Sequence, residues 1–198
     1  VIKKRHAEKA AKAGVDGLIL VAAGAGGHAG TLNPMPLVFE IKKFFKKTIL
    51  LSGCISTARD IASAMQMGAD LAYMGTRFIN TKESNAPKAH RDMIIECSAS
   101  DIIYTAAISG VPANFLGPSL KAMGITEEML ERKIKVDFGK ELTAEKDDVK
   151  AWATIWSAGQ GVTTITNSPS VSDLVSNLKT EFKTAIEEQC KLLETYKQ

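Results

Sequence analysis

A glycine-rich stretch with one histidine is the part of the sequence best suited to chemistry. It runs from Ala22 to Gly30 (AAGAGGHAG) and contains His28. Glycines have no side chain, so they let a flat or anionic ligand approach the backbone closely. Histidine adds the side chain whose pKa lies nearest neutrality, which suits proton transfer. The alternative interpretation is a glycine-rich loop with a solvated histidine, and the local residue content does not separate the two.

Two further glycine-containing segments have the composition of a phosphate site. They are Ser52–Thr57 (SGCIST) and Met74–Phe78 (MGTRF), and each offers exposed backbone N–H groups. Adjacent loops of this kind form the phosphate cradle of eight-stranded α/β barrels. The alternative is that the glycines only make tight turns. Cys54 suits a backbone-donating turn residue better than a nucleophile, because no histidine follows it nearby.

These segments follow three short apolar runs, which we expect to be strands. The runs are Gly17–Val21, Thr48–Ser52 and Leu71–Met74. Their lack of polar alternation is typical of parallel strands that are buried on both faces. Helical patterns lie between the runs, and Thr57 with Asp60 forms a capping-box pattern. Strand–helix–strand units of this size predict a parallel α/β sheet, and ligands bind at the carboxyl ends of such strands.

The sequence changes character after about residue 81, and we expect three regions. Residues 1–84 would form the α/β part, residues 85–168 an inserted cap, and residues 169–198 a helix that returns to the α/β part. This last helix has an apolar stripe from Val171 to Leu193 and a Ser170–Asp173 cap. Within residues 85–168 the pattern predicts helices at 87–97 and 126–135, an extended piece at 101–107, turns at 111–120, an exposed charged piece at 139–150, and one packing surface formed by Trp152 and Trp156.

Length and composition exclude several classes of protein. The chain has 198 residues, of which 45% are hydrophobic and 24% are charged, as in ordinary globular domains. No apolar run approaches the roughly 20 residues of a membrane-spanning helix. A net charge of +3, from 25 basic and 22 acidic residues, is too balanced to suggest nucleic acid as a partner.

The number and spacing of cysteines and histidines predict neither disulfides nor a metal site. The three cysteines are far apart and odd in number, which is typical of a reducing compartment without disulfides. The three histidines are isolated, and no cluster has the spacing of metal ligands. No signal-peptide pattern opens the chain, and no dinucleotide fingerprint is present. We therefore expect a cytoplasmic protein with no metal, no membrane and no nucleic-acid partner.

Four segments, taken in order, resemble one enzyme family. They are GLILVAAGAGGHAGTLNP, ILLSGCISTARDIASAMQMGADLAYMGTRFINTKES, YTAAISGVPANFLGPSL and WSAGQGV. This series is similar to the nitronate monooxygenases, formerly called 2-nitropropane dioxygenases, and the likeness runs through nearly the whole chain. The GGH loop is shared with a related flavin-dependent enoyl reductase of fatty-acid synthesis. The resemblance implies an FMN-dependent (β/α)8 TIM barrel, an α/β fold, with a smaller α+β substrate domain inserted after the last strand.

The resemblance also implies roles for residues of the three loops. His28 would be the catalytic base that takes the acidic α-carbon proton of a nitroalkane. A nitronate or nitroalkane and oxygen would be the substrates, with carbonyl compounds and nitrite as products. Backbone amides of the second and third loops would hold the FMN phosphate, and Gly26 and Gly27 would lie along the flavin. The complete implied cofactor set is Ala22, Gly24, Gly26, Gly27, Gly53, Cys54, Tyr73, Met74, Gly75, Thr76, Ser157 and Gln160.

This chain departs from the family pattern in three ways. Cys54 stands where many members have glycine, and Val21 stands where many have glutamine. A complete barrel takes about 250 residues, whereas only three strands, matching the last three of the barrel, are recognisable here. We expect the other strands to come from an N-terminal segment or from another chain. A homodimer is the alternative partner.

Three other functions fit the same residues. A flavin-dependent enoyl reductase would share the GGH loop but would need NAD(P)H. A phosphate-binding isomerase or synthase barrel would use the two phosphate-type loops without flavin. A non-catalytic half barrel would only await the segment that completes it.

Overall fold

A three-stranded parallel sheet forms the first half of the molecule and confirms the three predicted strands. The computed structural model describes residues 1–108, 110–126, 129–130 and 155–197. The strands β1 (Gly17–Val21), β3 (Thr48–Ser52) and β4 (Leu71–Tyr73) lie in the order β1-β3-β4. Both pairs are parallel, and Leu50 of β3 lies between Ile19 of β1 and Leu71 of β4.

Three helices cover one face of the sheet, one before β1 in the chain, one between β1 and β3, and one between β3 and β4. They are α1 (Lys4–Lys12), α2 (Pro34–Lys42) and α3 (Ala58–Gln66). The predicted capping box of α3 is present, with Thr57 and Asp60 as its two members. Gly68 adopts a φ of 103° just beyond the end of α3, as a helix stop requires. The core between helices and sheet includes Leu18, Leu20, Leu37, Val38, Ile41, Ile49 and Leu51.

The opposite face of this sheet is uncovered in the described part of the chain, which corrects the expectation of strands buried on both faces. Ile19 is 40% exposed and Leu71 is 54% exposed, whereas Leu18 and Leu20 on the helix side are buried. An apolar residue on each face is nevertheless typical of strands covered on both sides. The row formed by Ile19, Leu50 and Leu71 is therefore a face that needs a further layer.

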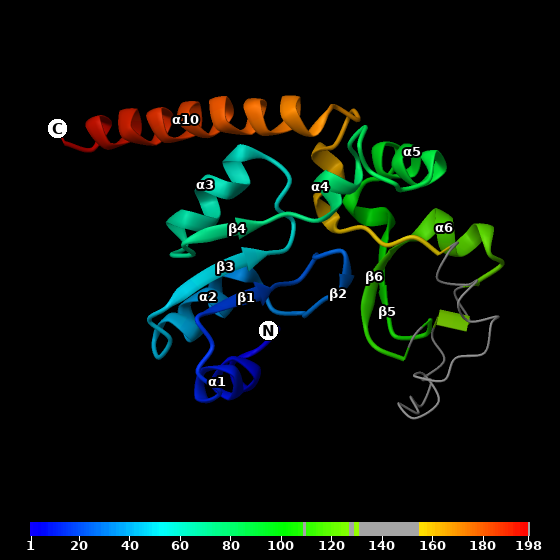
Figure 1. Ribbon diagram of the computed structural model, residues 1–198, viewed down its shortest axis with the longest axis horizontal. Helices are drawn as coiled ribbons and strands as arrows, with labels where there is room; N and C mark the ends of the chain where they lie inside the picture. The colour runs from blue at the N-terminus through cyan, green and yellow to red at the C-terminus, as the bar shows by residue number, and fades with distance from the viewer. Residues whose placement is uncertain (109, 127–128, 131–154, 198) are drawn as a thin grey trace.

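An antiparallel sheet lies at the other end of the molecule (Figure 1). Its strands are β2 (Gly27–His28), β6 (Ala113–Leu116) and β5 (Ile102–Thr105), in the order β2-β6-β5. β5 confirms the predicted extended piece, whereas the prediction of turns at 111–120 missed β6. Pro112 precedes this strand, and Pro118 lies at the start of α6 (Gly117–Ala122). The prolines therefore lie at the ends of regular elements and do not interrupt them, because a missing N–H group is tolerated at these positions.

The remaining helices connect the two sheets and cover them. They are α4 (Thr76–Ile79), α5 (Lys88–Glu96), the 3₁₀ turns Ala99–Asp101 and Gln160–Thr164, and α10 (Val171–Thr195). α5 and α10 confirm predicted helices, and the Ser170 hydroxyl caps α10 by accepting from the N–H of Asp173 (3.0 Å). α10 lies along α3 (Figure 1). Arg59 of α3 pairs there with Glu188 of α10.

Several expectations lie outside the described residues: most of the predicted helix at 126–135, the charged piece at 139–150, and Trp152. No helix in the described part of the chain is long and apolar enough to cross a membrane. The described ranges also contain no group of three or more His, Cys, Asp or Glu residues suited to a metal ion. All three cysteines are free, and Cys97 is buried.

Candidate cofactor and active site

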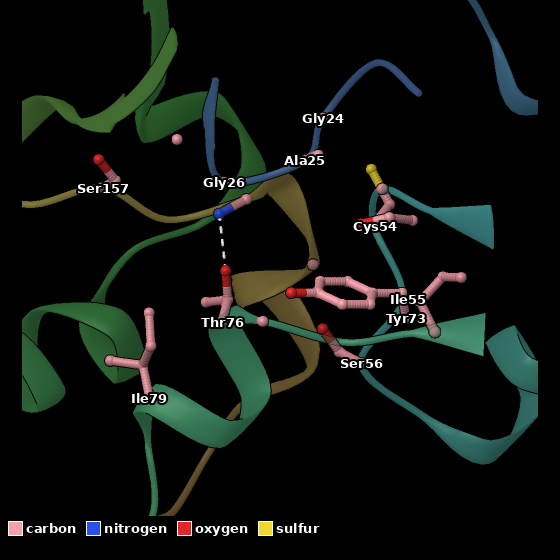
Figure 2. A pocket seen from close by; sticks show the side chains of 16 residues that line it. Gly24, Ala25, Gly26, Cys54, Ile55, Ser56, Tyr73, Thr76, Ile79 and Ser157 are labelled. Atoms are coloured by element: carbon pink, nitrogen blue, oxygen red, sulfur yellow. Dashed lines mark hydrogen bonds between the residues drawn. The ribbon is translucent and has the colours of Figure 1, made fainter. Parts of the chain in front are cut away.

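A cavity of about 220 Å³ lies at the carboxyl ends of β1, β3 and β4. The loops after these strands form one side of it, and the segment 157–161 forms another (Figure 2). None of the lining residues carries a charge, so polar contacts come from backbone groups, hydroxyls and one thiol. The lining residues are Gly24, Ala25, Gly26, Gly27, Ser52, Gly53, Cys54, Ile55, Ser56, Tyr73, Gly75, Thr76, Ile79, Ser157, Gly159 and Gly161.

The capping box of α3 holds the loop that follows β3. Asp60 Oδ2 accepts hydrogen bonds from the N–H groups of Ser56 (2.9 Å) and Thr57 (2.8 Å). The preceding turn is sharp, because Gly53 and Cys54 have φ values of 123° and 59°. Among the described residues Cys54 is the one non-glycine residue with positive φ, a conformation that favours glycine. The sharp turn at one end of this loop and the capping box at the other thus fix its backbone at the cavity wall.

The loop after β4 contains an open space beside Gly75. A Cβ atom added at Gly75 would meet no heavy atom within 4 Å, and its φ of −110° is not left-handed. Neither backbone conformation nor protein packing therefore requires glycine at this position. α4 begins directly afterwards, so the N–H groups of Thr76 and Arg77 have no acceptor within the helix. The space suits a group that approaches the backbone closely and accepts hydrogen bonds from it.

The segment 157–161 packs directly on the first loop because it contains glycine at the contact. A Cβ atom added at Gly159 would lie 2.6 Å from the carbonyl oxygen of Gly24. The N–H of Gly159 donates to Thr76 Oγ1 at 2.9 Å (Figure 2). The N–H of Gln160 donates to the Gly24 carbonyl at 2.9 Å. These bonds tie the third loop to the first through a segment that lies far away in sequence.

The thiol of Cys54 points toward the same segment. Its Sγ lies 3.6 Å from the Ala23 carbonyl oxygen and 3.8 Å from Gln160 Oε1, within reach of weak hydrogen bonds. Desolvation by the surrounding protein raises the pKa of the Cys54 thiol, and the Asp60 carboxylate acts in the same direction. A raised pKa keeps the group a thiol near neutral pH and lowers its reactivity. This supports the interpretation of Cys54 as a turn residue and not a nucleophile.

His28 lies beside the cavity and not in its wall. Its neighbour Gly27 lines the cavity, and the His28 backbone is in register with Ala113 of β6. The imidazole is exposed. The side chain is therefore accessible from solvent, next to a residue of the cavity wall.

A second histidine, His90 of α5, is buried behind the segment 157–161. Its ring stacks on Trp156, with 5.2 Å between ring centroids and 11° between planes. Its Nε2 lies 3.2 Å from the carbonyl oxygen of Ser157, a cavity residue. Desolvation lowers the pKa of His90, and the hydrogen bond to Ser157 partly opposes this. His90 is thus a neutral packing group that supports the cavity wall from outside.

The comparison with known families decides which family this fold and this cavity belong to. A family model described as nitronate monooxygenase matches residues 3–181. The chain belongs to the nitronate monooxygenase family. A nitronate monooxygenase of Paraburkholderia phytofirmans is 28% identical over 198 aligned positions, which cover 93% of this chain and 54% of the relative. A Mycobacterium tuberculosis protein that is named as a monooxygenase by assignment is 33% identical over 113 positions, which cover 57% of this chain and 30% of the relative.

Solved structures support the fold of this nitronate monooxygenase family member. FabK from Thermotoga maritima superposes with a TM-score of 0.78 at 24% identity, over 97% of this chain and 62% of FabK. A nitroalkane oxidase from Streptomyces ansochromogenes gives a TM-score of 0.76 at 24% identity, over 96% of this chain and 58% of the oxidase. The family and these neighbours indicate a TIM-barrel-like α/β fold, of which the described strands form partial sheets. The chain spans about half or less of the length of its curated relatives.

The structure brings most of the predicted cofactor residues of this family member together. Nine of the twelve line the cavity: Gly24, Gly26, Gly27, Gly53, Cys54, Tyr73, Gly75, Thr76 and Ser157. Of the other three, Ala22 is fully buried, Met74 packs against the apolar core, and Gln160 binds Gly24. The lining also includes seven residues that were not predicted: Ala25, Ser52, Ile55, Ser56, Ile79, Gly159 and Gly161. Six of these lie inside the quoted loops or the stretch 157–161, whereas nothing in the sequence marks the apolar Ile79.

Proposed function

We propose that the protein uses FMN to oxidise nitronates and nitroalkanes with oxygen, giving carbonyl compounds and nitrite. The observation that carries the proposal is the convergence of three glycine-containing loops on one uncharged cavity beside Gly27 and His28. The match of residues 3–181 to the nitronate monooxygenase family supports it. The activity is assigned to the intact protein, because these residues span 54% or less of the curated relatives.

The FMN phosphate would occupy the open space beside Gly75. No heavy atom lies within 4 Å of a Cβ added there, which supports a ligand group at this point. The first N–H groups of α4 and those of the Gly53–Cys54 turn would donate to the phosphate oxygens. Hydrogen bonds to a charged group are worth about 1.5–3 kcal/mol each. The lining contains no cation, so backbone amides would carry the anion, as they do in other phosphate-binding turns.

The flavin ring would lie along Gly26 and Gly27, partly outside the cavity. The volume of about 220 Å³ is below the roughly 300–1,000 Å³ of typical ligand pockets. The other flavin contacts would come from the layer that covers Ile19, Leu50 and Leu71. In this assignment residues 1–84 belong to the FMN-binding barrel, residues 85–168 to the inserted substrate domain, and residues 169–198 to the helix that returns to the barrel.

His28 would act on the substrate by proton transfer. An unprotonated imidazole nitrogen would accept the α-carbon proton of a nitroalkane. The electron pair of the broken C–H bond moves into the nitro group, and the product is the nitronate. FMN, when bound, supplies the electron transfer between substrate and oxygen. A nitronate supplied as such does not need the proton step.

The test of this function begins with the intact purified protein. We expect a flavin absorption spectrum, release of FMN as judged by chromatography, and oxygen uptake that depends on added nitronate. His28→Asn should slow turnover of neutral nitroalkanes by about 10²–10⁴-fold. Turnover of pre-formed nitronate should fall much less. An equal loss for both substrates, with flavin retained, would make His28 a binding residue and not a base.

Other outcomes would replace the proposed function. Rapid flavin reduction by NAD(P)H, without nitronate-dependent oxygen uptake, would indicate an enoyl reductase-like oxidoreductase. A colourless protein with activity on a phosphorylated substrate would indicate an isomerase or synthase barrel. Release of FAD in place of FMN would contradict the cofactor assignment.

The proposal also includes the setting of the reaction. We place it in the cytoplasm, because three free cysteines suit a reducing compartment. The substrates are small molecules and oxygen, and a net charge of +3 gives no basis for a nucleic-acid partner. The uncovered sheet face would be closed by an N-terminal segment or, alternatively, by a second copy of the chain.

A further inference from the structure

The loop that carries His28 receives two side-chain hydrogen bonds from the antiparallel sheet. Asn114 Nδ2 donates to the carbonyl oxygen of Ala25 at 2.6 Å. The Tyr104 hydroxyl donates to the carbonyl oxygen of Ala29 at 3.0 Å. One of these carbonyls precedes His28 in the chain and the other follows it. The two donors therefore hold the loop on both sides of the histidine.

Tyr104 and Asn114 form a single cross-strand pair. The register of β5 and β6 places Tyr104 opposite Asn114, so both side chains leave the same face of the sheet. Asn114 is also opposite Gly27 in the pairing of β6 with β2. Asn114 is 3% exposed, so its hydrogen bond is shielded from water, whereas Tyr104 is 41% exposed. The hydroxyl of Tyr104 can therefore be removed without opening a cavity in the core.

Main-chain contacts also hold this loop, since the Gln160 N–H donates to the Gly24 carbonyl and β2 pairs with β6, but the loop itself is rich in glycine. Gly24 and Gly27 adopt φ values of 80° and 67°, which few other residues tolerate. β2 is two residues long and lies at the edge of its sheet. Glycine-rich backbone loses more conformational freedom on ordering than other backbone does. Side-chain donors from β5 and β6 of the same sheet offset that loss and select one loop conformation.

We propose that Tyr104 and Asn114 are positioning residues that set the location of His28 for proton transfer, without touching substrate or cofactor. The inference rests on the proposed function, since it assumes that His28 is a base. A proton acceptor must lie within hydrogen-bond reach of the proton that it takes. A displacement of about 1 Å can reduce the rate by about 10²-fold. Loss of either donor should therefore act on the proton step and not on flavin binding.

Tyr104→Phe is the decisive variant, and Tyr196→Phe is its matched control. Tyr196 is 85% exposed just beyond the end of α10, far from this loop in sequence. In the intact protein Tyr104→Phe should lower kcat/KM for neutral nitroalkanes by about 10-fold to 10²-fold. FMN content and turnover of pre-formed nitronate should stay at the wild-type level, and Tyr196→Phe should change neither. The melting temperature of Tyr104→Phe should fall only slightly, because the buried Ala29 carbonyl loses one neutral hydrogen bond. Equal loss for nitroalkane and nitronate would overturn the inference.

A double variant tests whether Tyr104 acts through His28. In the His28→Asn background, Tyr104→Phe should cause no further loss of nitroalkane turnover, because residues that act as a unit are not additive. A loss equal to that in the wild-type background would overturn the inference. Asn114→Ala should resemble Tyr104→Phe in its substrate dependence, with some loss of melting temperature because a buried carbonyl loses its donor.

Hydrogen–deuterium exchange provides a measurement that does not depend on activity. Exchange of the peptide that covers residues 24–30 should be faster in Tyr104→Phe than in the wild type and in Tyr196→Phe. Unchanged exchange would overturn the inference whatever the substrate is. Faster exchange in a protein that oxidises neither nitroalkanes nor nitronates would refute the proposed function, while the dependence of this loop on Tyr104 would stand.

Discussion

Replacement of Gly75 by alanine separates ligand binding from folding. The added Cβ meets no heavy atom within 4 Å, and the backbone is not left-handed. The free energy of unfolding of the apoprotein should therefore change by no more than about 0.5 kcal/mol. If the FMN phosphate occupies this space, the methyl group displaces it from the backbone amides. Loss of one hydrogen bond to a charged group costs about 1.5–3 kcal/mol, which raises the Kd for FMN by about 10- to 150-fold.

Gly14 provides a matched control for this substitution. A Cβ added at Gly14 also meets no heavy atom within 4 Å, but its φ is 84°. Alanine in the left-handed region costs about 1–2 kcal/mol. Gly14 lies between α1 and β1 and does not line the cavity. Gly14→Ala should therefore lower the melting temperature and leave the affinity for FMN unchanged. Gly75→Ala should leave the melting temperature unchanged and lower the affinity for FMN.

The assay is a titration of the apoprotein with FMN, followed by the change in flavin fluorescence. Riboflavin, which has no phosphate, is the second titrant. Gly75→Ala should weaken FMN binding and leave riboflavin binding as it is, because the substitution acts on the phosphate alone. Equal weakening of both flavins, or unchanged FMN affinity in a well-folded variant, would refute the placement of the phosphate beside Gly75.

Three further predictions concern His90, Cys54 and the uncovered sheet face. Because the pKa of buried His90 is lowered in the folded protein, this histidine takes up a proton at a higher pH in the unfolded chain than in the folded one. Stability should thus be complete above about pH 6.5 and fall as pH drops through the folded-state pKa. His90→Phe, which keeps a ring against Trp156, should show a flatter melting-temperature profile over that window. Cys54 should react slowly with maleimide because the pKa of its thiol is raised. Mass spectrometry should show that FMN protects Cys54 from this reaction and does not protect the exposed Cys190. The 198 residues expressed alone should self-associate through the apolar face and bind FMN weakly, and co-expression with an N-terminal segment that supplies strands should restore both properties.

Each of these three predictions has a contrary result. Parallel pH profiles for the wild type and His90→Phe would mean that this histidine does not titrate differently in the folded state. Modification of Cys54 at the same rate with and without FMN would place the cofactor elsewhere. A monodisperse monomer of these 198 residues with stoichiometric FMN would show that the sheet face needs no further layer.

The parallel-sheet half could be predicted from the sequence because its signals are local. Each strand is a short apolar run, and each is followed within a few residues by glycine. The capping box of α3 is set by Thr57 and Asp60, which are neighbours on one turn. Loops at the carboxyl ends of adjacent parallel strands must meet at one edge of the sheet. That geometry is why eight of the nine lining residues that the family resemblance implied meet at one cavity, whereas Ser157 reaches it from the segment 157–161.

The antiparallel sheet could not be predicted in the same way because its determinants are distant. β6 is flanked by Pro112 and Pro118, and prolines in a short stretch are ordinarily evidence for turns. Its strand character comes from burial of all four residues between neighbours, which no local pattern expresses. The pairing of β6 with β2 joins positions that are more than 80 residues apart in the chain. Only the folded structure shows that the second half of the chain reaches the histidine loop.

Some residues of the site are therefore positioned by local sequence signals, and others by contacts between segments that are distant in the sequence. The residues that would bind the phosphate lie on loops at the carboxyl ends of adjacent parallel strands, where Asp60 and Gly159 hold them by hydrogen bonds. In our inference the position of His28 depends in addition on Tyr104 and Asn114, whose hydrogen bonds reach the residues on either side of β2 from the other two strands of its sheet. In the proposed function, flavin binding and proton transfer would thus depend on different parts of the molecule. Substitutions in the antiparallel sheet should alter the rate of turnover of neutral nitroalkanes, and substitutions of glycines at the strand ends should alter the affinity for flavin. Tyr104→Phe tests the first expectation, and Gly75→Ala tests the second.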